Sequence, residues 1–117
     1  MSELNSSGFD TICLHGGHKT ESNRAHITPI YASSTYTFDS AEQAIALFKG
    51  EEKGYIYGRW GSPTINEAEE KIALLEGYGL KDASGGPLQL KAILHASGMA
   101  AITTMLLGNL KAGQKVI

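Results

Sequence analysis

The sequence contains one cysteine and has no long apolar run. That cysteine, Cys13, cannot form an intramolecular disulfide, which favours a reducing compartment. The longest largely apolar stretch, residues 99–107, is interrupted by two threonines and is too short to span a bilayer, so we predict no membrane segment. The first eight residues carry neither a basic leader nor an apolar core. We therefore expect no secretory signal and a cytoplasmic location.

The sequence also lacks an excess of basic charge. Ten basic side chains stand against twelve acidic ones, and the formal net charge is -2. Without an electropositive stripe, binding to nucleic acid through its phosphates is not expected, although small anions remain possible ligands. A hydrophobic content of 42% and a charged content of 19% are typical of a soluble globular protein, and 117 residues allow at most one modest domain.

The first third of the chain is predicted to be an extended arm. Residues 1–38 show little helical periodicity, and residues 27–38 are rich in β-branched and aromatic side chains. Pro29 disfavours a helix just before it. Because the arm has few aliphatic side chains for a core of its own, we expect it to cover another surface, most naturally that of a partner subunit.

Two helices are predicted around a segment that is broken by glycines. Ser40 has the character of an N-cap, with Gln43 three residues later, and Gly50 ends this first short helix. The second helix covers residues 63–77, with Pro63 and Thr64 at its start, Glu67 three residues after Thr64, and apolar residues on one face. Between them lies "YIYGRWGS", residues 55–62, which we call the strap. Its glycines predict an irregular segment that is exposed to something it binds.

The last third is predicted to be a loop followed by a βα unit. Residues 78–90 contain Gly-Gly-Pro and indicate an exposed loop. A strand at 92–95, a turn of small residues at 96–98, a helix at 99–110 and a second strand at 114–117 follow. Two short strands cannot make an α/β sheet alone, so we expect the chain to be a portion of a longer enzyme.

Two segments have the chemistry of an anion site. At Ser97, Gly98 and Met99 a strand is expected to pass into a helix, where backbone amides, the helix dipole and a hydroxyl suit a phosphate. Arg59 offers planar, charge-assisted hydrogen bonds, and Tyr57 adds a phenol two residues away, on the same side if the stretch is extended. A capped helix on a sheet and a solvated arginine beside packing aromatics are the alternatives.

Four segments together carry a resemblance to a known family. "PIYASSTYTF", "YIYGRWGSPT", "ALLEG" and "HASGMAAI" occur in the order seen in the Cys/Met-metabolism family of pyridoxal-phosphate (PLP) enzymes, and the chain resembles that family from about Thr11 onward. The resemblance implies an α/β fold: the N-terminal part of a fold-type I PLP-dependent transferase, a three-layer αβα sandwich, preceded by an extended arm. It divides the chain into the arm and inter-subunit strap, residues 1–62, and the beginning of the PLP-binding domain, residues 63–117.

The resemblance also implies a cofactor, a site and an assembly. The cofactor is pyridoxal 5'-phosphate, and the expected assembly is a homotetramer, a dimer of dimers with active sites shared between subunits. Tyr57 and Arg59 are implied to reach the cofactor phosphate of the neighbouring subunit, while Ser97, Gly98 and Met99 hold the same phosphate from their own subunit. The family's Schiff-base lysine lies farther along the chain than these motifs, so no catalytic residue is assigned here.

The implied reaction is γ-replacement or elimination on a small sulfur-containing amino acid or on O-acylhomoserine. We favour replacement, as in O-acylhomoserine sulfhydrylase or cystathionine γ-synthase, ahead of a C–S lyase such as methionine γ-lyase or cystathionine lyase. Three features depart from the family's pattern. Ser62 stands where relatives usually have asparagine, Gly58 stands where many have serine, and the loop 78–90 is long for the family, without a functional account.

Other classes of function remain open from the residues alone. Cys13, His15 and His18 lie close enough in sequence to ligate a transition metal, but no fourth ligand is evident and no metal is predicted. Cys13 as a nucleophile has no identifiable base beside it. A non-catalytic phosphate-binding module or a docking fragment would also fit a soluble chain of this size. Neither rival predicts the visible absorption band of protein-bound PLP.

Overall fold

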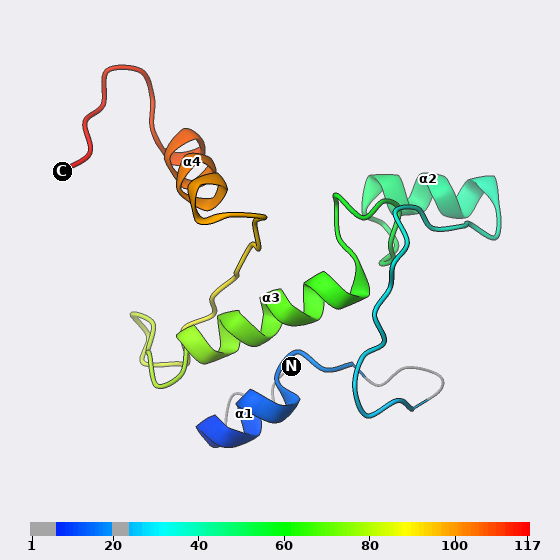
Figure 1. Cartoon of the computed structure of the whole chain (residues 1–117), viewed down its shortest axis with the longest axis horizontal. Coiled ribbons are helices and arrows are strands. Elements are labelled where there is room, and N and C mark those ends of the chain that lie inside the picture. Colours follow the sequence, from blue (N-terminus) through cyan, green and yellow to red (C-terminus); the bar gives the residue numbers. More distant parts are fainter. Residues whose placement is uncertain (1–6, 20–23) are drawn as a thin grey trace.

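The computed structural model describes residues 7–19 and 24–117 (Figure 1). The helices are α1 (Phe9–His15), α2 (Ala41–Lys49), α3 (Pro63–Glu76) and α4 (Gly98–Asn109). Within these described ranges there is no strand, only two isolated antiparallel β-bridges, Thr35 with Tyr57 and Lys81 with Pro87. α3 occupies the middle of the molecule, α1 lies beside it, and α2 and α4 stand on opposite sides (Figure 1).

The chain is more open than a closed domain of its length. Its radius of gyration is 17.2 Å, whereas a compact domain of about 100 residues has a value of roughly 13 Å. Ile12, at 2% exposure, is the one apolar side chain buried among the described residues. Much of the apolar surface, notably on α4, is therefore left for other polypeptide to cover.

Helix α1 corrects the expectation that residues 1–38 are extended throughout. Its seven residues are too few to show a period, and a helix this short depends on packing rather than propensity. Ile12 supplies that packing against α3. After the helix, Gly17 lies against the α3 backbone: its φ is +76°, and a Cβ built there would be 2.5 Å from the carbonyl oxygen of Glu67. The described rest of the arm, residues 24–38, has no helix, as predicted.

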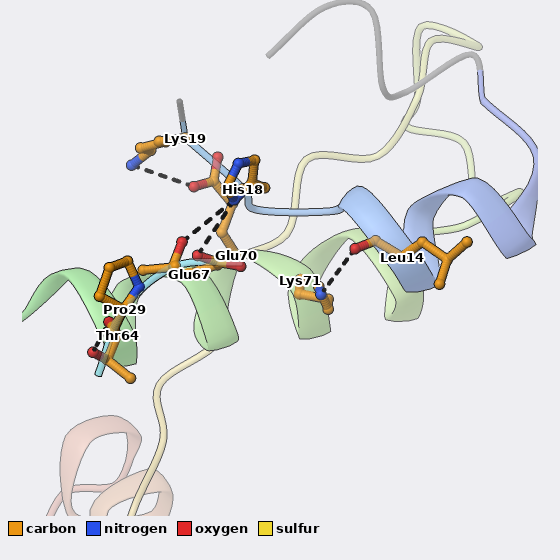
Figure 2. Close-up of polar contacts among 9 residues, drawn as sticks. Leu14, His18, Lys19, Pro29, Thr64, Glu67, Glu70 and Lys71 are labelled. Carbon is orange, nitrogen blue, oxygen red and sulfur yellow. Dashed lines mark hydrogen bonds and ion pairs between the residues drawn. The ribbon is translucent and has the colours of Figure 1, made fainter. Parts of the chain in front are cut away.

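Polar contacts reinforce the packing of this N-terminal region on α3 (Figure 2). The ammonium of Lys19 lies 3.4 Å from a carboxylate oxygen of Glu70. In the other direction, Lys71 donates to the carbonyl oxygen of Leu14 at 3.5 Å. Each exposed pair of this kind contributes little to stability. Close packing and the buried Ile12 therefore account for most of the contact between the N-terminal region and α3.

Helix α2 forms as the sequence predicts. The Ser40 hydroxyl accepts a hydrogen bond from the backbone N–H of Gln43 at 3.1 Å. The Gln43 side chain reaches back and accepts from the N–H of Asp39 at 2.7 Å. Gly50, with φ of +73°, ends the helix in the left-handed conformation that glycine adopts without strain.

Helix α3 also forms as predicted, but its cap is not the one expected. The Ser62 hydroxyl accepts from the N–H of Ile65 at 3.2 Å, and Pro63 occupies the first turn. Thr64 was expected to begin a capping box with Glu67. Because Ser62 already caps the helix, the Thr64 hydroxyl instead bonds to the arm.

The loop 78–90 is irregular and largely exposed, as predicted. Asp82 organises it: one carboxylate oxygen accepts from the N–H of Ser84 at 2.8 Å, from the Ser84 hydroxyl at 2.6 Å and from the N–H of Gly86 at 3.0 Å. Hydrogen bonds from the side chain and backbone of Ser84 lower the pKa of the Asp82 carboxyl.

The two predicted strands, residues 92–95 and 114–117, are not strands in this chain. A strand needs a neighbour to complete its hydrogen bonds, and the described residues offer none at either place. Residues 92–95 are held to α3 by one bond instead, from the N–H of Leu94 to a Glu69 carboxylate oxygen at 2.9 Å. Helix α4 matches its predicted bounds within one residue at each end. Among the described residues no helix is long and apolar enough to cross a membrane.

Candidate functional site

The strap presents Tyr57 and Arg59 from a tight turn. Tyr57 pairs with Thr35 of the arm, the N–H of Gly58 donates to the carbonyl oxygen of Ser34 at 2.8 Å, and the N–H of Trp60 donates to the carbonyl oxygen of Tyr57 at 2.8 Å. Residues 57–60 are thus irregular, as predicted, and not extended. The turn still brings the two side chains together, with the guanidinium carbon of Arg59 4.9 Å from the centre of the Tyr57 ring.

The charge of Arg59 is not neutralised by any described residue. The ion pairs found in the described ranges involve His18, Lys19 and Lys49, not Arg59. The side chain is exposed and edges a shallow pocket of about 300 Å³. An exposed guanidinium without a carboxylate partner is suited to an external anion.

Aromatic residues fix the strap against α2. The rings of Phe48 and Trp60 meet edge to face with centroids 5.7 Å apart, and Phe38 and Phe48 lie 6.4 Å apart. These contacts position Trp60, and therefore the chain on either side of it. Trp60 itself remains 66% exposed, which leaves apolar surface beside Arg59.

The start of α4 carries the second group of predicted anion donors. The Ser97 hydroxyl accepts from the N–H of Ala100 at 3.2 Å, and this leaves its own proton to donate. The amides of Gly98 and Met99, in the first turn, have no hydrogen-bond acceptor among the described residues. A Cβ built on Gly98 would meet nothing within 4 Å, so the space beside these amides is open.

The donors of the two segments suit the phosphate of PLP. Arg59, Tyr57, the Ser97 hydroxyl proton and two backbone amides can all donate, and the set includes no carboxylate. A helix N-terminus adds favourable dipole charge for an anion. The pocket that Arg59 edges is lined by none of Ser97, Gly98 and Met99, so the two groups do not share that pocket within one chain.

A larger pocket, of about 830 Å³, lies elsewhere. It is lined mainly by α3, the loop 78–90 and residues that follow this loop, and it includes none of the five predicted site residues. Its lining mixes apolar residues with charged ones, among them Lys19, Glu69 and Glu70. The two donor groups remain the candidates for an anion, because the lysines of the larger pocket share it with Glu69 and Glu70, whereas the two donor groups include no carboxylate.

The residues considered for a metal do not converge. Cys13 is exposed, the ring of His15 packs against that of His26 with centroids 5.8 Å apart, and Nδ1 of His18 lies 4.0 Å from Oε2 of Glu67 (Figure 2). In the described ranges no group of three or more His, Cys, Asp or Glu side chains is placed to hold a metal ion.

Sequence reasoning missed two polar residues that hold the neighbourhood of the site. Thr64 ties the arm to α3, and Glu69 ties the segment before the α4 turn to the same helix. For Thr64 a signal was present: a serine directly before a proline at the first helical position is itself the N-cap, which leaves the threonine hydroxyl available. Nothing local to Glu69 indicates its distant partner.

Comparison with known proteins identifies the family. Residues 10–117 match the family of Cys/Met metabolism PLP-dependent enzymes. The chain belongs to this family. It is 41% identical over 115 residues to the L-methionine gamma-lyase of Porphyromonas gingivalis, which covers 98% of this chain and 26% of that enzyme. The chain thus spans about a quarter of the length of such a relative.

Two solved structures are similar to the chain. The crystal structure of metB from Corynebacterium glutamicum superposes with a TM-score of 0.68 at 32% identity, covering 95% of this chain and 24% of that one. A putative O-acetylhomoserine (thiol)-lyase from Campylobacter jejuni, crystallised with a pyridoxyl-lysine monophosphate, gives a TM-score of 0.57 at 33% identity, covering 62% and 18%. The expected fold class, the N-terminal part of a fold-type I PLP-dependent enzyme, is confirmed by these similarities.

Proposed function

We propose that this chain supplies the phosphate-binding part of a PLP-dependent enzyme that carries out γ-replacement or γ-elimination on sulfur-containing amino acids or O-acylhomoserine. The observation that carries the proposal is a pair of donor groups without a hydrogen-bond acceptor among the described residues: the guanidinium of Arg59, and the amides of Gly98 and Met99. When bound, PLP supplies an electron sink for the carbon from which the substrate proton is removed. The residues of this chain bind and orient it.

The two donor groups serve one phosphate from two subunits. Ser97, Gly98 and Met99 hold it from their own subunit, and Tyr57 and Arg59 reach it from the neighbouring one. The pocket beside Arg59, which residues 97–99 do not line, the exposed Arg59 and the exposed arm support this arrangement. It makes a dimer the smallest active unit, and a tetramer of two such dimers the expected assembly.

The first experiment removes the Arg59 guanidinium. In the full-length enzyme that contains this chain, Arg59→Ala should raise the dissociation constant of PLP by about 10- to 100-fold, because a hydrogen-bonded charge contributes about 1.5–3 kcal/mol. PLP binding is followed through the visible absorption of the protein-bound cofactor. Arg24→Ala, at the only other arginine of the chain, is the matched control and should bind PLP as the unmodified enzyme does. Unchanged affinity in Arg59→Ala would make Arg59 a surface residue.

A second experiment tests whether the site is shared. Ser97→Asp retains an N-cap of equal quality but places a carboxylate against the phosphate. Alone, this variant and Arg59→Ala should both be impaired. Co-expressed, they form hybrid dimers in which one site has both an intact turn and an intact strap, so activity should return to a substantial fraction. No recovery in isolated hybrids would contradict a site built from two subunits.

The substrate is identified by direct assay of the same full-length enzyme. O-acetylhomoserine with sulfide tests replacement, and cystathionine and methionine test elimination. The similarity to a γ-lyase and to a thiol-lyase supports both reaction types. A purified full-length protein with neither a visible PLP band nor turnover of any of the three would favour a non-catalytic phosphate-binding or docking role.

A further inference from the structure

The hydroxyl of Thr64 joins the arm to the start of α3. Thr64 is the second residue of the helix, and since Ser62 caps the helix, its hydroxyl makes bonds of its own. It accepts from the N–H of Tyr31 at 2.9 Å. It donates to the carbonyl oxygen of Pro29 at 3.2 Å (Figure 2). One hydroxyl thus uses both its acceptor and its donor on two backbone groups of the arm.

These two bonds fix the register of the arm. A slip by one residue would present different backbone groups to Thr64. A slip by two residues would place Pro29, which has no N–H, where Tyr31 now donates. Farther along, the arm pairs with the strap through the bridge between Thr35 and Tyr57. The N–H of Tyr36 donates to the carbonyl oxygen of Ile56 at 3.3 Å there.

The arm, the strap and α3 are therefore joined pairwise, each to the other two. The strap leads covalently into α3 at Ser62, the arm pairs with the strap, and Thr64 ties the arm back to α3. If the Thr64 bonds are lost, the arm and the strap still pair with each other, but the arm no longer ties this pair to the start of α3. The turn that carries Tyr57 and Arg59 then samples more orientations.

We propose that Thr64 is a positioning residue for the phosphate contact of Tyr57 and Arg59, acting through the arm without touching the cofactor. This inference rests on the proposed function. Only one neutral hydroxyl with two hydrogen bonds is involved, so loss of the Thr64 hydroxyl should weaken PLP binding less than loss of the Arg59 guanidinium.

The test uses the full-length enzyme and three substitutions at Thr64. Thr64→Val keeps the shape and removes the hydroxyl, Thr64→Ala is a second variant without the hydroxyl, and Thr64→Ser keeps it. Thr37→Val, in the same arm, is the matched control, because the Thr37 hydroxyl has no hydrogen-bond partner among the described residues.

We expect Thr64→Val and Thr64→Ala to raise the dissociation constant of PLP by about 3- to 10-fold. In the cofactor-free protein, deuterium exchange of peptides covering residues 56–60 should be faster, because the Gly58 amide is bonded to Ser34 of the arm. Thr64→Ser should restore both values to within about twofold, and Thr37→Val should change neither.

Three outcomes separate this inference from the proposed function. If Arg59→Ala weakens PLP binding but Thr64→Val changes neither affinity nor exchange, Thr64 does not position the strap. If Thr64→Ser is impaired as much as Thr64→Val, the hydroxyl is not the cause. If Arg59→Ala leaves the PLP affinity unchanged, the proposed phosphate contact fails. The link from Thr64 to the strap is then tested separately, and unchanged deuterium exchange of residues 56–60 in Thr64→Val would overturn it.

Discussion

The two segments that we propose to bind phosphate are held in contrasting ways by this chain. The strap is tied on one side to the arm, on another to the aromatic rings of α2, and through Ser62 to α3. The Ser97 turn is ordered by its own cap, but α4 behind it stands apart from the other helices (Figure 1). Contacts within the chain position the strap, whereas they give the Ser97 turn its local conformation without positioning it against the other helices.

The sequences of the helices explain this difference. α3 carries charges on one side and apolar residues on the other, so it can be half covered. α4, "GMAAITTMLLGN", has no charged residue, and Met99, Ile102, Met105 and Leu107 are all exposed. A helix that is apolar on every side is normally buried. α4 therefore requires cover from polypeptide other than the described residues, and that cover would fix the Ser97 turn.

The largest expected effect that tests this contrast comes from placing a charge on α4. Ile102 and Ile45 are similarly exposed here, at 47% and 54%. Ile45 of α2 has Glu42 and Lys49 as its helical neighbours, whereas the neighbours of Ile102 are apolar or glycine. Ile102→Asp should lower the free energy of unfolding of the full-length protein by about 3–5 kcal/mol, as an uncompensated buried charge does.

The matched control is Ile45→Asp, which should cost less than about 1 kcal/mol because its face is solvated. Urea denaturation of the full-length protein measures both. Equal losses in the two variants would mean that α4 is as exposed as α2 in the folded enzyme, and the contrast between the two segments would disappear.

The second prediction concerns the region that is held from within. Gly17→Ala places a Cβ 2.5 Å from the carbonyl oxygen of Glu67 and requires a left-handed backbone with φ of +76°. Separation of the arm from α3 should lower the free energy of unfolding by about 2–3 kcal/mol. Gly8→Ala is the control, since its φ is -66° and a Cβ there meets nothing within 4 Å.

Thermal and urea unfolding of the full-length protein measure the two glycine variants side by side. Gly8→Ala should stay within about 0.5 kcal/mol of the unmodified protein. If Gly17→Ala did likewise, the close approach of the arm to α3 would not exist in solution, and the strap would lose the support that distinguishes it from the Ser97 turn.

The elements that sequence predicts well are those specified by neighbouring residues. Ser40, Gly50 and Ser97 each act within a few positions, and the helices that they bound were predicted to within a residue or so. The Ser97 turn belongs to the same class, because its donors follow from a serine, a glycine and the start of a helix. Helix α1 was missed since seven residues hold too few apolar positions to define a period.

The elements that sequence predicts poorly depend on distant partners. The strands at 92–95 and 114–117 need a sheet that the described residues do not supply. Thr64 was taken for part of a cap, because its true partners, Pro29 and Tyr31, lie more than thirty positions away. The proposal that the strap and the turn serve one phosphate came from the family resemblance, since no local pattern encodes an assembly.

The smallest effects should come from a pair of matched caps. Ser62 on α3 and Ser97 on α4 each accept one backbone hydrogen bond at 3.2 Å, so alanine at either should cost about 1 kcal/mol of stability. Only Ser97 is predicted to donate its proton to the phosphate. Ser97→Ala should therefore also raise the dissociation constant of PLP about fivefold.

Ser62→Ala should change PLP affinity by less than about twofold, because Pro63 still fixes the first backbone angle of α3 and Thr64 keeps its bonds to the arm. Ser62→Asn should retain the stability as well, since asparagine caps as well as serine. Absorption titration with PLP and urea denaturation separate the two quantities. If both alanine variants lose stability but neither loses cofactor affinity, the Ser97 hydroxyl is a cap alone, and only the amides of Gly98 and Met99 remain to hold the phosphate from that side.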